Sequence, residues 1–175
     1  MSTMTYKEAL TQANSRLAGD KKIRFIGYGV AKGRALGTLK QVSASQIVET
    51  PVAENLMIGL AIGMSLKGLK PVVFIERMDF ILNALDSIVN HLDKINAISG
   101  GEFSPAAIIR VIVGNKNKPL YTGVTHVQDH SAALRQLVSF PVVEVKDAVA
   151  EAYAAAAARQ DRGISTILVE YKDLI

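Results

Sequence analysis

Short apolar runs rich in β-branched residues alternate along this chain with longer segments of helical periodicity, and this alternation restricts the folds open to it. The apolar runs cover residues 23–26, 46–48, 72–75, 107–113, 142–145 and 165–169. The helical segments cover residues 6–17, 52–67, 80–98, 132–138 and 148–159. Strands that are apolar on both faces and separated by crossover helices form parallel sheets with helices on both sides. The pattern therefore predicts an α/β fold, a three-layer α/β/α domain with a mostly parallel sheet of about six strands.

Length and composition narrow the class of protein. A chain of 175 residues favours a single domain, and the absence of cysteine excludes disulfides and thiolate metal sites. The longest nearly uncharged apolar stretch, residues 56–66, is shorter than the ~20 residues of a membrane-spanning helix. Twenty basic and sixteen acidic residues are spread along the chain, so the net charge of +4 does not indicate a nucleic-acid surface. We expect a cytoplasmic protein with no nucleic-acid or membrane partner.

The segment 52–67 carries clear signals for a helix and one unusual feature. Thr50 precedes Pro51, which predicts a capping hydroxyl before a first-turn proline, and Gly68 follows the last periodic residues. Gly59 and Gly63 lie four residues apart on one helix face, and each costs about 1 kcal/mol relative to alanine. Two explanations remain open. The glycines allow close packing on the domain's own sheet, or they allow close contact with a helix of another subunit.

Glu54 is the first candidate for chemistry. It lies in the first turn of the predicted helix, where a carboxylate interacts favourably with the helix dipole. Its neighbours are mostly apolar, so a partly buried carboxylate directed at a ligand is the alternative. Position in the sequence does not distinguish these two roles.

The least regular segment, residues 114–130, contains the remaining candidates. A loop of this length after a buried strand is often functional, and it follows the carboxyl end of that strand, where open α/β sheets bind ligands. His126, Gln128, Asp129 and His130 lie close together in it. The alternatives are incidental histidines in an exposed loop and general acid–base chemistry. No third ligand accompanies the two histidines, so we predict no metal site.

Several motifs follow in a fixed order from Glu49 to Phe103. They are Glu49-Thr-Pro-Val-Ala-Glu-Asn-Leu-Met-Ile-Gly-Leu-Ala-Ile-Gly63, Gly68-Leu-Lys-Pro-Val72, Asp79-Phe80, Asp86-Ser-Ile-Val-Asn90 and Ser99-Gly-Gly-Glu-Phe103. Together they resemble the pyrimidine-binding domain of the transketolase-like thiamine diphosphate enzymes. The resemblance is closest to the beta subunit of the decarboxylating component of 2-oxo-acid dehydrogenases. Gly123-Val-Thr-His126 is also similar to transketolases. The resemblance covers essentially the whole chain.

The resemblance implies a set of cofactor-binding residues. Glu54 matches the activating glutamate, which hydrogen-bonds a pyrimidine ring nitrogen and favours the imino tautomer that deprotonates the thiazolium carbon. A carboxyl is needed there because it must share a proton with a weakly basic nitrogen. Phe80 matches the aromatic that stacks on the aminopyrimidine. Met57 and Asp79, which lie beside these two residues in the motifs, are expected as further cofactor contacts.

The resemblance also implies substrate-binding residues. His126 matches the active-site histidine that faces the substrate or the acyl acceptor, and Gln128 follows it in the family's His-x-Gln pattern. His126 is therefore expected to be catalytic together with Glu54, and Gln128 to contact the substrate.

Departures from the family limit what one chain would do. Tyr28 stands where the dehydrogenase beta subunits have a glutamate after the first strand. The chain ends at Ile175, where those subunits continue into a C-terminal domain, and it has no Gly-Asp-Gly stretch with a following Asn for holding diphosphate through magnesium. We expect residues 1–175 to form one pyrimidine-binding domain, half of a thiamine diphosphate site, without a diphosphate-binding domain. A separate diphosphate-binding subunit would hold most of the Mg²⁺ ligands. A homodimer of this chain would complete a two-plus-two assembly.

Three functions remain open at this level. The motifs similar to the beta subunit favour decarboxylation and acyl transfer from a 2-oxo acid. The transketolase-like context of His126 allows two-carbon ketol transfer. A non-catalytic binding or regulatory module is the third, and Tyr28 together with the missing domain favours it.

Overall fold

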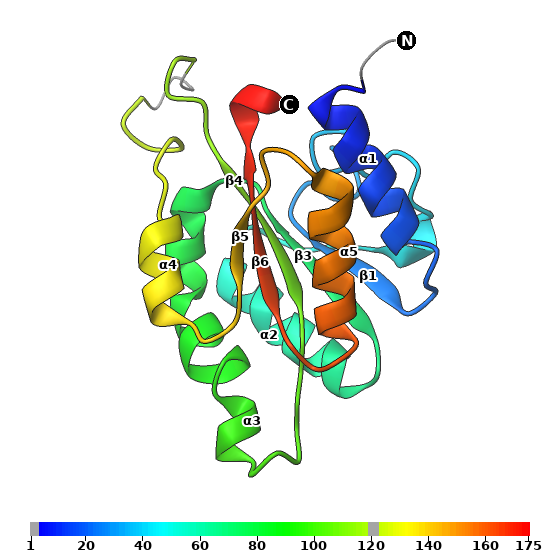
Figure 1. Cartoon of the computed structure of the whole chain (residues 1–175), viewed down its shortest axis with the longest axis vertical. Helices are drawn as coiled ribbons and strands as arrows, with labels where there is room; N and C mark the ends of the chain where they lie inside the picture. The colour runs from blue at the N-terminus through cyan, green and yellow to red at the C-terminus, as the bar shows by residue number, and fades with distance from the viewer. Residues whose placement is uncertain (1–3, 119–122) are drawn as a thin grey trace.

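Six apolar segments pair side by side into one parallel sheet, in the order β2-β1-β3-β4-β6-β5. The computed structural model describes residues 4–118 and 123–175 (Figure 1); residues 119–122 of the predicted loop lie outside this description. The strands are β1 (Ile23–Gly27), β2 (Ile47–Glu49), β3 (Lys70–Ile75), β4 (Ile108–Val113), β5 (Val142–Glu144) and β6 (Thr166–Tyr171). All six predicted strands are present, so the predicted α/β fold is confirmed.

Helices cover both faces of the sheet (Figure 1). On one face lie α1 (Tyr6–Leu17) and α5 (Val149–Gln160), and on the other lie α2 (Glu54–Leu66), α4 (Ser131–Leu137) and the segment that follows β3. Successive strand residues supply the two cores alternately: Val73 and Ile75 pack beneath α2, while Phe74 packs on the opposite face. This two-sided burial explains why the strands are apolar throughout rather than alternating.

The start of α2 differs from the prediction. The helix begins at Glu54, its N-cap is Ala53, and Thr50 caps nothing. The backbone N–H of Thr50 instead donates to the carbonyl oxygen of Gly27 at 3.0 Å, so it still belongs to the pairing of β2 with β1. The predicted cap at Thr50 and first-turn proline at Pro51 are therefore wrong. Thr50 is still hydrogen-bonded to β1, and the helix starts only at Glu54.

The predicted helix over residues 80–98 is divided into three pieces. They are a 3₁₀ segment, η2 (Met78–Ala84), a π-type segment, η3 (Asp86–Leu92), and a short helix, α3 (Ile95–Ile98). Met78, Ile81 and Ala84 are fully buried at a spacing of three residues, which matches the 3.0 residues per turn of a 3₁₀ helix. The 3₁₀ winding thus directs all three side chains toward the core.

Gly59 and Gly63 lie on the solvent side of α2. Both are exposed, and a Cβ built on either would meet no described atom within 4 Å. The explanation by close packing on the domain's own sheet is therefore wrong. Val52 and Leu56 are also exposed near this helix, so α2 presents an uncovered apolar face.

A buried ion pair crosses the centre of the sheet. Arg110 on β4 donates from Nε and Nη2 to the two carboxylate oxygens of Glu170 on β6, at 2.8 and 3.0 Å, and neither side chain is exposed. The Tyr153 hydroxyl on α5 donates to Glu170 Oε1 at 2.5 Å. Bidentate geometry and a third donor compensate for taking both charges out of water.

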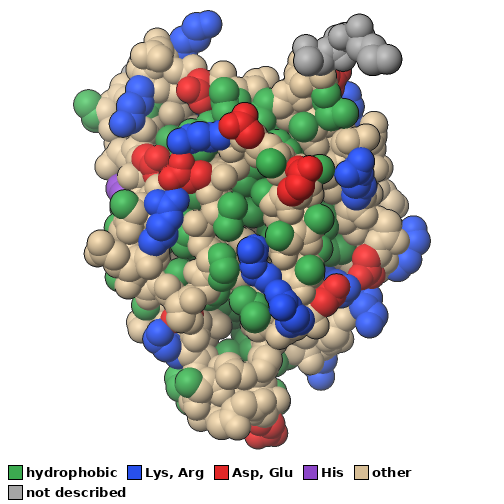
Figure 2. Space-filling model, viewed as in Figure 1, with side chains coloured by type: hydrophobic (Ala, Val, Ile, Leu, Met, Phe, Trp, Pro, Cys, Tyr) green, Lys and Arg blue, Asp and Glu red, His purple; other side chains and the backbone are tan. Residues whose placement is uncertain are grey.

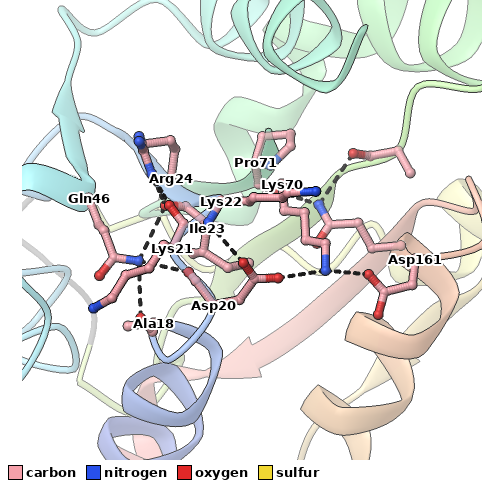
Figure 3. Close-up of polar contacts among 12 residues, drawn as sticks. Ala18, Asp20, Lys21, Lys22, Ile23, Arg24, Gln46, Lys70, Pro71 and Asp161 are labelled. Carbon is pink, nitrogen blue, oxygen red and sulfur yellow. Dashed lines mark hydrogen bonds and ion pairs between the residues drawn. The ribbon is translucent and has the colours of Figure 1, made fainter. Parts of the chain in front are cut away.

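Polar contacts also stabilise the end of the sheet at which β1 and β3 begin (Figure 3). Lys70 Nζ lies 2.6 Å from Asp20 and 2.5 Å from Asp161, so it joins the turn before β1 to the end of α5. Gln46 Nε2 donates to the carbonyl oxygens of Ala18 and Asp20 at 3.1 and 3.0 Å. These contacts therefore connect the amino ends of β1 and β3 to the neighbouring helices and turns. They do not involve the carboxyl ends of these strands.

The surface shows no separation of charge on the face drawn in Figure 2, where basic and acidic side chains are interspersed. None of the helices that the structure describes is both long and apolar enough to cross a bilayer.

Candidate active site

A cavity of about 210 Å³ lies at the carboxyl ends of β1 and β3, beside the start of α2. Its apolar wall consists of Val52, Met57, Phe74, Ile75 and Phe80, and its polar lining of Tyr28, Glu54, Glu76, Arg77 and His126. The chain thus brings four of the predicted site residues, Glu54, Met57, Phe80 and His126, to one cavity. The cavity lies at the carboxyl-terminal edge of the parallel sheet, where open α/β sheets bind ligands.

Glu54 is the first residue of α2 and is only 6% exposed. Asn83 Nδ2 donates to Glu54 Oε2 at 3.3 Å, the one hydrogen bond of this carboxylate among the residues that the structure describes. A buried carboxylate normally gains several donors, because an unpaired buried charge is costly. Glu54 thus lies at the start of α2 and presents a carboxylate with one hydrogen bond to the cavity.

Phe80 and His126 contact each other in the cavity wall. Their ring centroids lie 4.9 Å apart with an interplanar angle of 89°, an edge-to-face arrangement. Phe80 comes from η2, and His126 comes from the loop after β4. Met57, one turn into α2 and fully buried, forms part of the same wall.

Asp79 holds the segment that carries His126. Its Oδ1 accepts a hydrogen bond from the backbone N–H of His126 at 2.9 Å and from Nε2 of Gln128 at 2.8 Å. Asp79 and Gln128 are not among the residues that line the cavity. The structure thus places these two predicted contacts behind His126, where they bind each other.

Gly114, the residue after β4, lets the His126 segment approach the sheet. A Cβ at Gly114 would lie 1.6 Å from the carbonyl oxygen of His126, which no side chain could accommodate. His126 itself has a φ of 71°, a left-handed conformation that a non-glycine residue adopts only when its surroundings enforce it. Sequence reasoning missed Gly114, although a glycine directly after a buried strand was the signal.

A second cavity, of about 400 Å³, adjoins the first and shares Tyr28, Phe74 and Glu76 with it. Glu49 lies in its wall and accepts hydrogen bonds from the backbone N–H groups of Gly29 and Ala31, at 2.5 and 2.6 Å. Tyr28 is half exposed at the boundary between the two cavities. The position directly after β1 therefore carries a neutral aromatic, while the nearby acid, Glu49, accepts hydrogen bonds from the loop that follows Tyr28.

Arg77 is the other site residue that the sequence did not reveal. It follows β3, its side chain is 8% exposed, and Nη1 lies 3.3 Å from Glu76 Oε1. Nothing in a Glu-Arg pair after an apolar strand distinguishes a buried arginine from a solvated one. Only the way η2 turns back over the sheet places Arg77 in the cavity wall.

Comparisons with known proteins identify the family of this chain and several relatives. The model of the family described as "Transketolase, pyrimidine binding domain" matches residues 2–174. The mitochondrial pyruvate dehydrogenase E1 component subunit beta of Saccharomyces cerevisiae is 34% identical over 135 residues, 74% of this chain and 36% of that protein. The corresponding subunit of Rickettsia conorii is 29% identical over 146 residues, 80% of this chain and 44% of that protein.

A solved structure shares the fold. It is described as "Split gene transketolase, inactive beta4 tetramer", superimposes with a TM-score of 0.72 at 17% identity, and covers 98% of this chain and 52% of its own. This chain spans less than half the length of the two curated relatives. The match over nearly every residue, and the predicted motifs gathered at one cavity, show that the chain belongs to the transketolase pyrimidine-binding domain family.

Proposed function

We propose that residues 1–175 form one pyrimidine-binding domain of a split thiamine diphosphate-dependent enzyme, which decarboxylates a 2-oxo acid and transfers the acyl group. The buried, under-coordinated carboxylate of Glu54 carries this proposal, because it lines one cavity together with Phe80 and His126. The family implies the cofactor, and the similarity to pyruvate dehydrogenase E1 beta subunits supports the acyl chemistry.

The cavity fits one end of the cofactor. Sites for drug-sized ligands usually measure about 300 to 1,000 Å³. A volume of about 210 Å³ with an apolar wall suits a single substituted ring. Glu54 would hold the pyrimidine nitrogen, and Phe80 and Met57 would pack on the ring. When bound, thiamine diphosphate supplies a carbon nucleophile that adds to the carbonyl group of the substrate.

The residues of this chain would control protons around that ring. Glu54 needs a partner with which to share a proton, and its low-dielectric surroundings strengthen such a hydrogen bond. His126 Nδ1 lies 2.8 Å from the Thr125 hydroxyl oxygen, which orients the imidazole. We assign His126 to proton transfer at the substrate or the acyl acceptor, and Gln128, bound to Asp79, to holding His126 in place.

A separate subunit would hold the diphosphate and most of the Mg²⁺ ligands. Among residues 4–118 and 123–175, no three His, Asp or Glu side chains are grouped so as to bind a metal ion. We therefore expect the purified chain to bind thiamine diphosphate weakly and without turnover, and addition of the diphosphate-binding chain with Mg²⁺ to restore both. Isothermal titration calorimetry tests this. Tight, magnesium-dependent binding by the chain alone would contradict the half-site proposal.

The apolar face of α2 supports a homodimer within a two-plus-two assembly. Gly59 and Gly63 leave room there for close approach of a second helix, and Leu56 is exposed beside them. Sedimentation velocity should show a wild-type dimer, and replacing both glycines with leucine should weaken it, because overpacking typically costs about 1 to 3 kcal/mol. A wild-type monomer, or a variant that dimerises equally well, would contradict this assignment.

We place the assembly in the cytoplasm.

Ketol transfer is the second candidate, and Gly123-Val-Thr-His126 favours it. The two reactions differ in the donor, so assays of the reconstituted enzyme with a 2-oxo acid and with a ketose phosphate separate them. A non-catalytic module would show turnover with neither donor.

A further inference from the structure

This inference rests on the proposed function and concerns Arg77, the one permanent cation among the described residues that line the 210 Å³ cavity. The Arg77 side chain is 8% exposed. Its Nη1 donates to the carbonyl oxygen of Glu76 at 2.8 Å. Its Nε and Nη2 make no hydrogen bond to any residue within the described parts of the chain. The two nitrogens that form the outer fork of the guanidinium are therefore available to a ligand.

Most of the Arg77 side chain is removed from water, although its Nε and Nη2 are not among the fully buried atoms without a partner. Removing a charged group from water costs free energy unless hydrogen bonds replace its hydration, and the adjacent Glu76 is 38% exposed and pairs only with Nη1. Nothing in the proposed cofactor contacts uses Arg77, since Glu54, Phe80 and Met57 account for the ring. Its position in the cavity wall therefore indicates a second, negatively charged ligand group.

Carboxylates and cations both surround Arg77: Glu54 and Glu76 line the same cavity, and Lys172 lies near it. Lys172, directly after β6, is close enough to Arg77 and Lys7 that burial and these two cations lower the pKa of its ammonium group, while Glu76 acts in the opposite direction. Arg77 and Lys7 thus both act on Lys172, and Glu76 offsets part of their charge. An anion that enters beside Arg77 would be attracted by Arg77 and Lys172 together.

The chemistry of the proposed reaction decides which anion this is. The carboxylate next to the 2-oxo group leaves as carbon dioxide, and an ion pair with it would stabilise the substrate more than the transition state. Arg77 would contribute more by binding a group that stays on the substrate throughout the reaction. The adjoining 400 Å³ cavity shares Tyr28, Phe74 and Glu76 with the first but is not lined by Arg77, so it has room for the part of the substrate that Arg77 does not bind.

We propose that Arg77 binds a second oxyanion, at the end of the substrate remote from the reacting carbon, so that the substrate is a dianion. The free Nε and Nη2 fork matches two oxygens of a carboxylate or a phosphate. A 2-oxo acid with a terminal carboxylate or phosphate group is therefore the substrate class.

Titration of the purified 175-residue chain, with no cofactor, metal or second subunit present, tests the oxyanion site. Glutarate, inorganic phosphate and the uncharged glutaramide are added to ¹⁵N-labelled protein, and the backbone amides of Glu76, Arg77 and Phe80 are followed by NMR. Glutarate or phosphate should give saturable shifts at these amides, and glutaramide should not. Tighter binding of glutarate than of phosphate indicates a terminal carboxylate, and the reverse order a phosphate ester.

Arg77→Gln should weaken the tighter anion about tenfold or more, as expected for lost charge-assisted hydrogen bonds. Arg77→Lys, which keeps the charge, should lose less. Arg162→Gln changes an exposed arginine that lines a different cavity and serves as the matched control. Amide dispersion shows whether each variant is folded. Absence of saturable shifts at the three amides, or equal shifts in Arg77→Gln, would overturn the oxyanion site.

The reconstituted enzyme tests the substrate class. The ratio of kcat/KM for 2-oxoglutarate over 2-oxobutyrate, or for a phosphorylated 2-oxo acid over 2-oxobutyrate, should exceed one and fall about tenfold in Arg77→Gln. No preference for either dianion in the wild-type enzyme would overturn the assignment. If the titration succeeds while the chain fails to activate thiamine diphosphate, the oxyanion site stands and the proposed function fails. If activation succeeds without anion binding, only the role of Arg77 fails.

Discussion

One carboxylate oxygen of Asp79 accepts hydrogen bonds from both the backbone N–H of His126 and the side chain of Gln128. The next residue, Phe80, meets the His126 ring edge to face. Two consecutive residues of η2 therefore set the position of His126, one through its main chain and one through its ring. This short 3₁₀ segment therefore links the wall that contains Phe80 to the segment that carries His126.

Replacing Asp79 with alanine should release the His126 segment. Because a hydrogen bond to a charged group contributes about 1.5 to 3 kcal/mol, the free energy of unfolding should fall by at least that amount. The amide resonances of His126 and Gln128 should shift or broaden in an NMR spectrum. Asp86→Ala, which removes an exposed aspartate near η2, is the matched control. Unchanged His126 resonances in Asp79→Ala would show that the segment is held by other contacts.

The buried pair of Arg110 and Glu170 should be sensitive to the loss of one member. Arg110→Met leaves the Glu170 carboxylate buried without its cation, and such changes typically cost about 3 to 5 kcal/mol. The double variant Arg110→Met/Glu170→Leu removes both charges and should recover most of the loss. Urea unfolding at neutral pH measures both. A single variant as stable as the double variant would contradict the importance of the pairing.

Acid sensitivity should arise partly at Glu144 on β5. Hydrogen bonds from Lys146, Arg135 and Tyr171 lower the pKa of this carboxyl from its ordinary 4.5 to about 2. A depressed folded-state pKa stabilises the protein above pH 4.5, and this contribution disappears as the pH falls toward 2. The difference in unfolding free energy between wild type and Glu144→Gln should therefore shrink between about pH 7 and about pH 3.

Titration of the Glu144 carboxyl by ¹³C NMR gives a direct check. Lys146→Met removes the largest cause of the shift and should move this pKa back toward 4.5. An unchanged titration in Lys146→Met would assign the shift to the other donors.

The sheet was predictable because each strand is apolar on both faces and bounded by turn residues, a local signal that survives in a single sequence. The start of α2 was not, because the pairing of Thr50 with Gly27 depends on a strand elsewhere in the chain. The winding of η2 was also missed, since a spacing of three at Met78, Ile81 and Ala84 fits a 3₁₀ segment and an imperfect α-helix alike.

Some residues of the candidate site were predictable from the sequence, and others were not. Glu54, Phe80 and His126 were predicted from motifs, and they line one cavity. The roles of Gly114 and Arg77 follow from tertiary contacts: Gly114 from a main chain passing over it, and Arg77 from the turn of η2. Such contacts join residues distant in the chain; the glycine after a buried strand was a local signal for Gly114, and Arg77 had none.

The central claim is that Glu54 activates thiamine diphosphate. It is tested most directly by exchange of the thiazolium proton in the reconstituted enzyme, followed by quenched-flow NMR. Glu54→Gln preserves the shape of the side chain and can hydrogen-bond, but it cannot share a proton with the ring nitrogen. Exchange should therefore slow by roughly 10² to 10⁴, as is typical for loss of a positioned acid–base group. Glu102→Gln, in the exposed loop after α3, is the control. An exchange rate unchanged by Glu54→Gln would contradict the account and reduce Glu54 to a residue at a helix terminus.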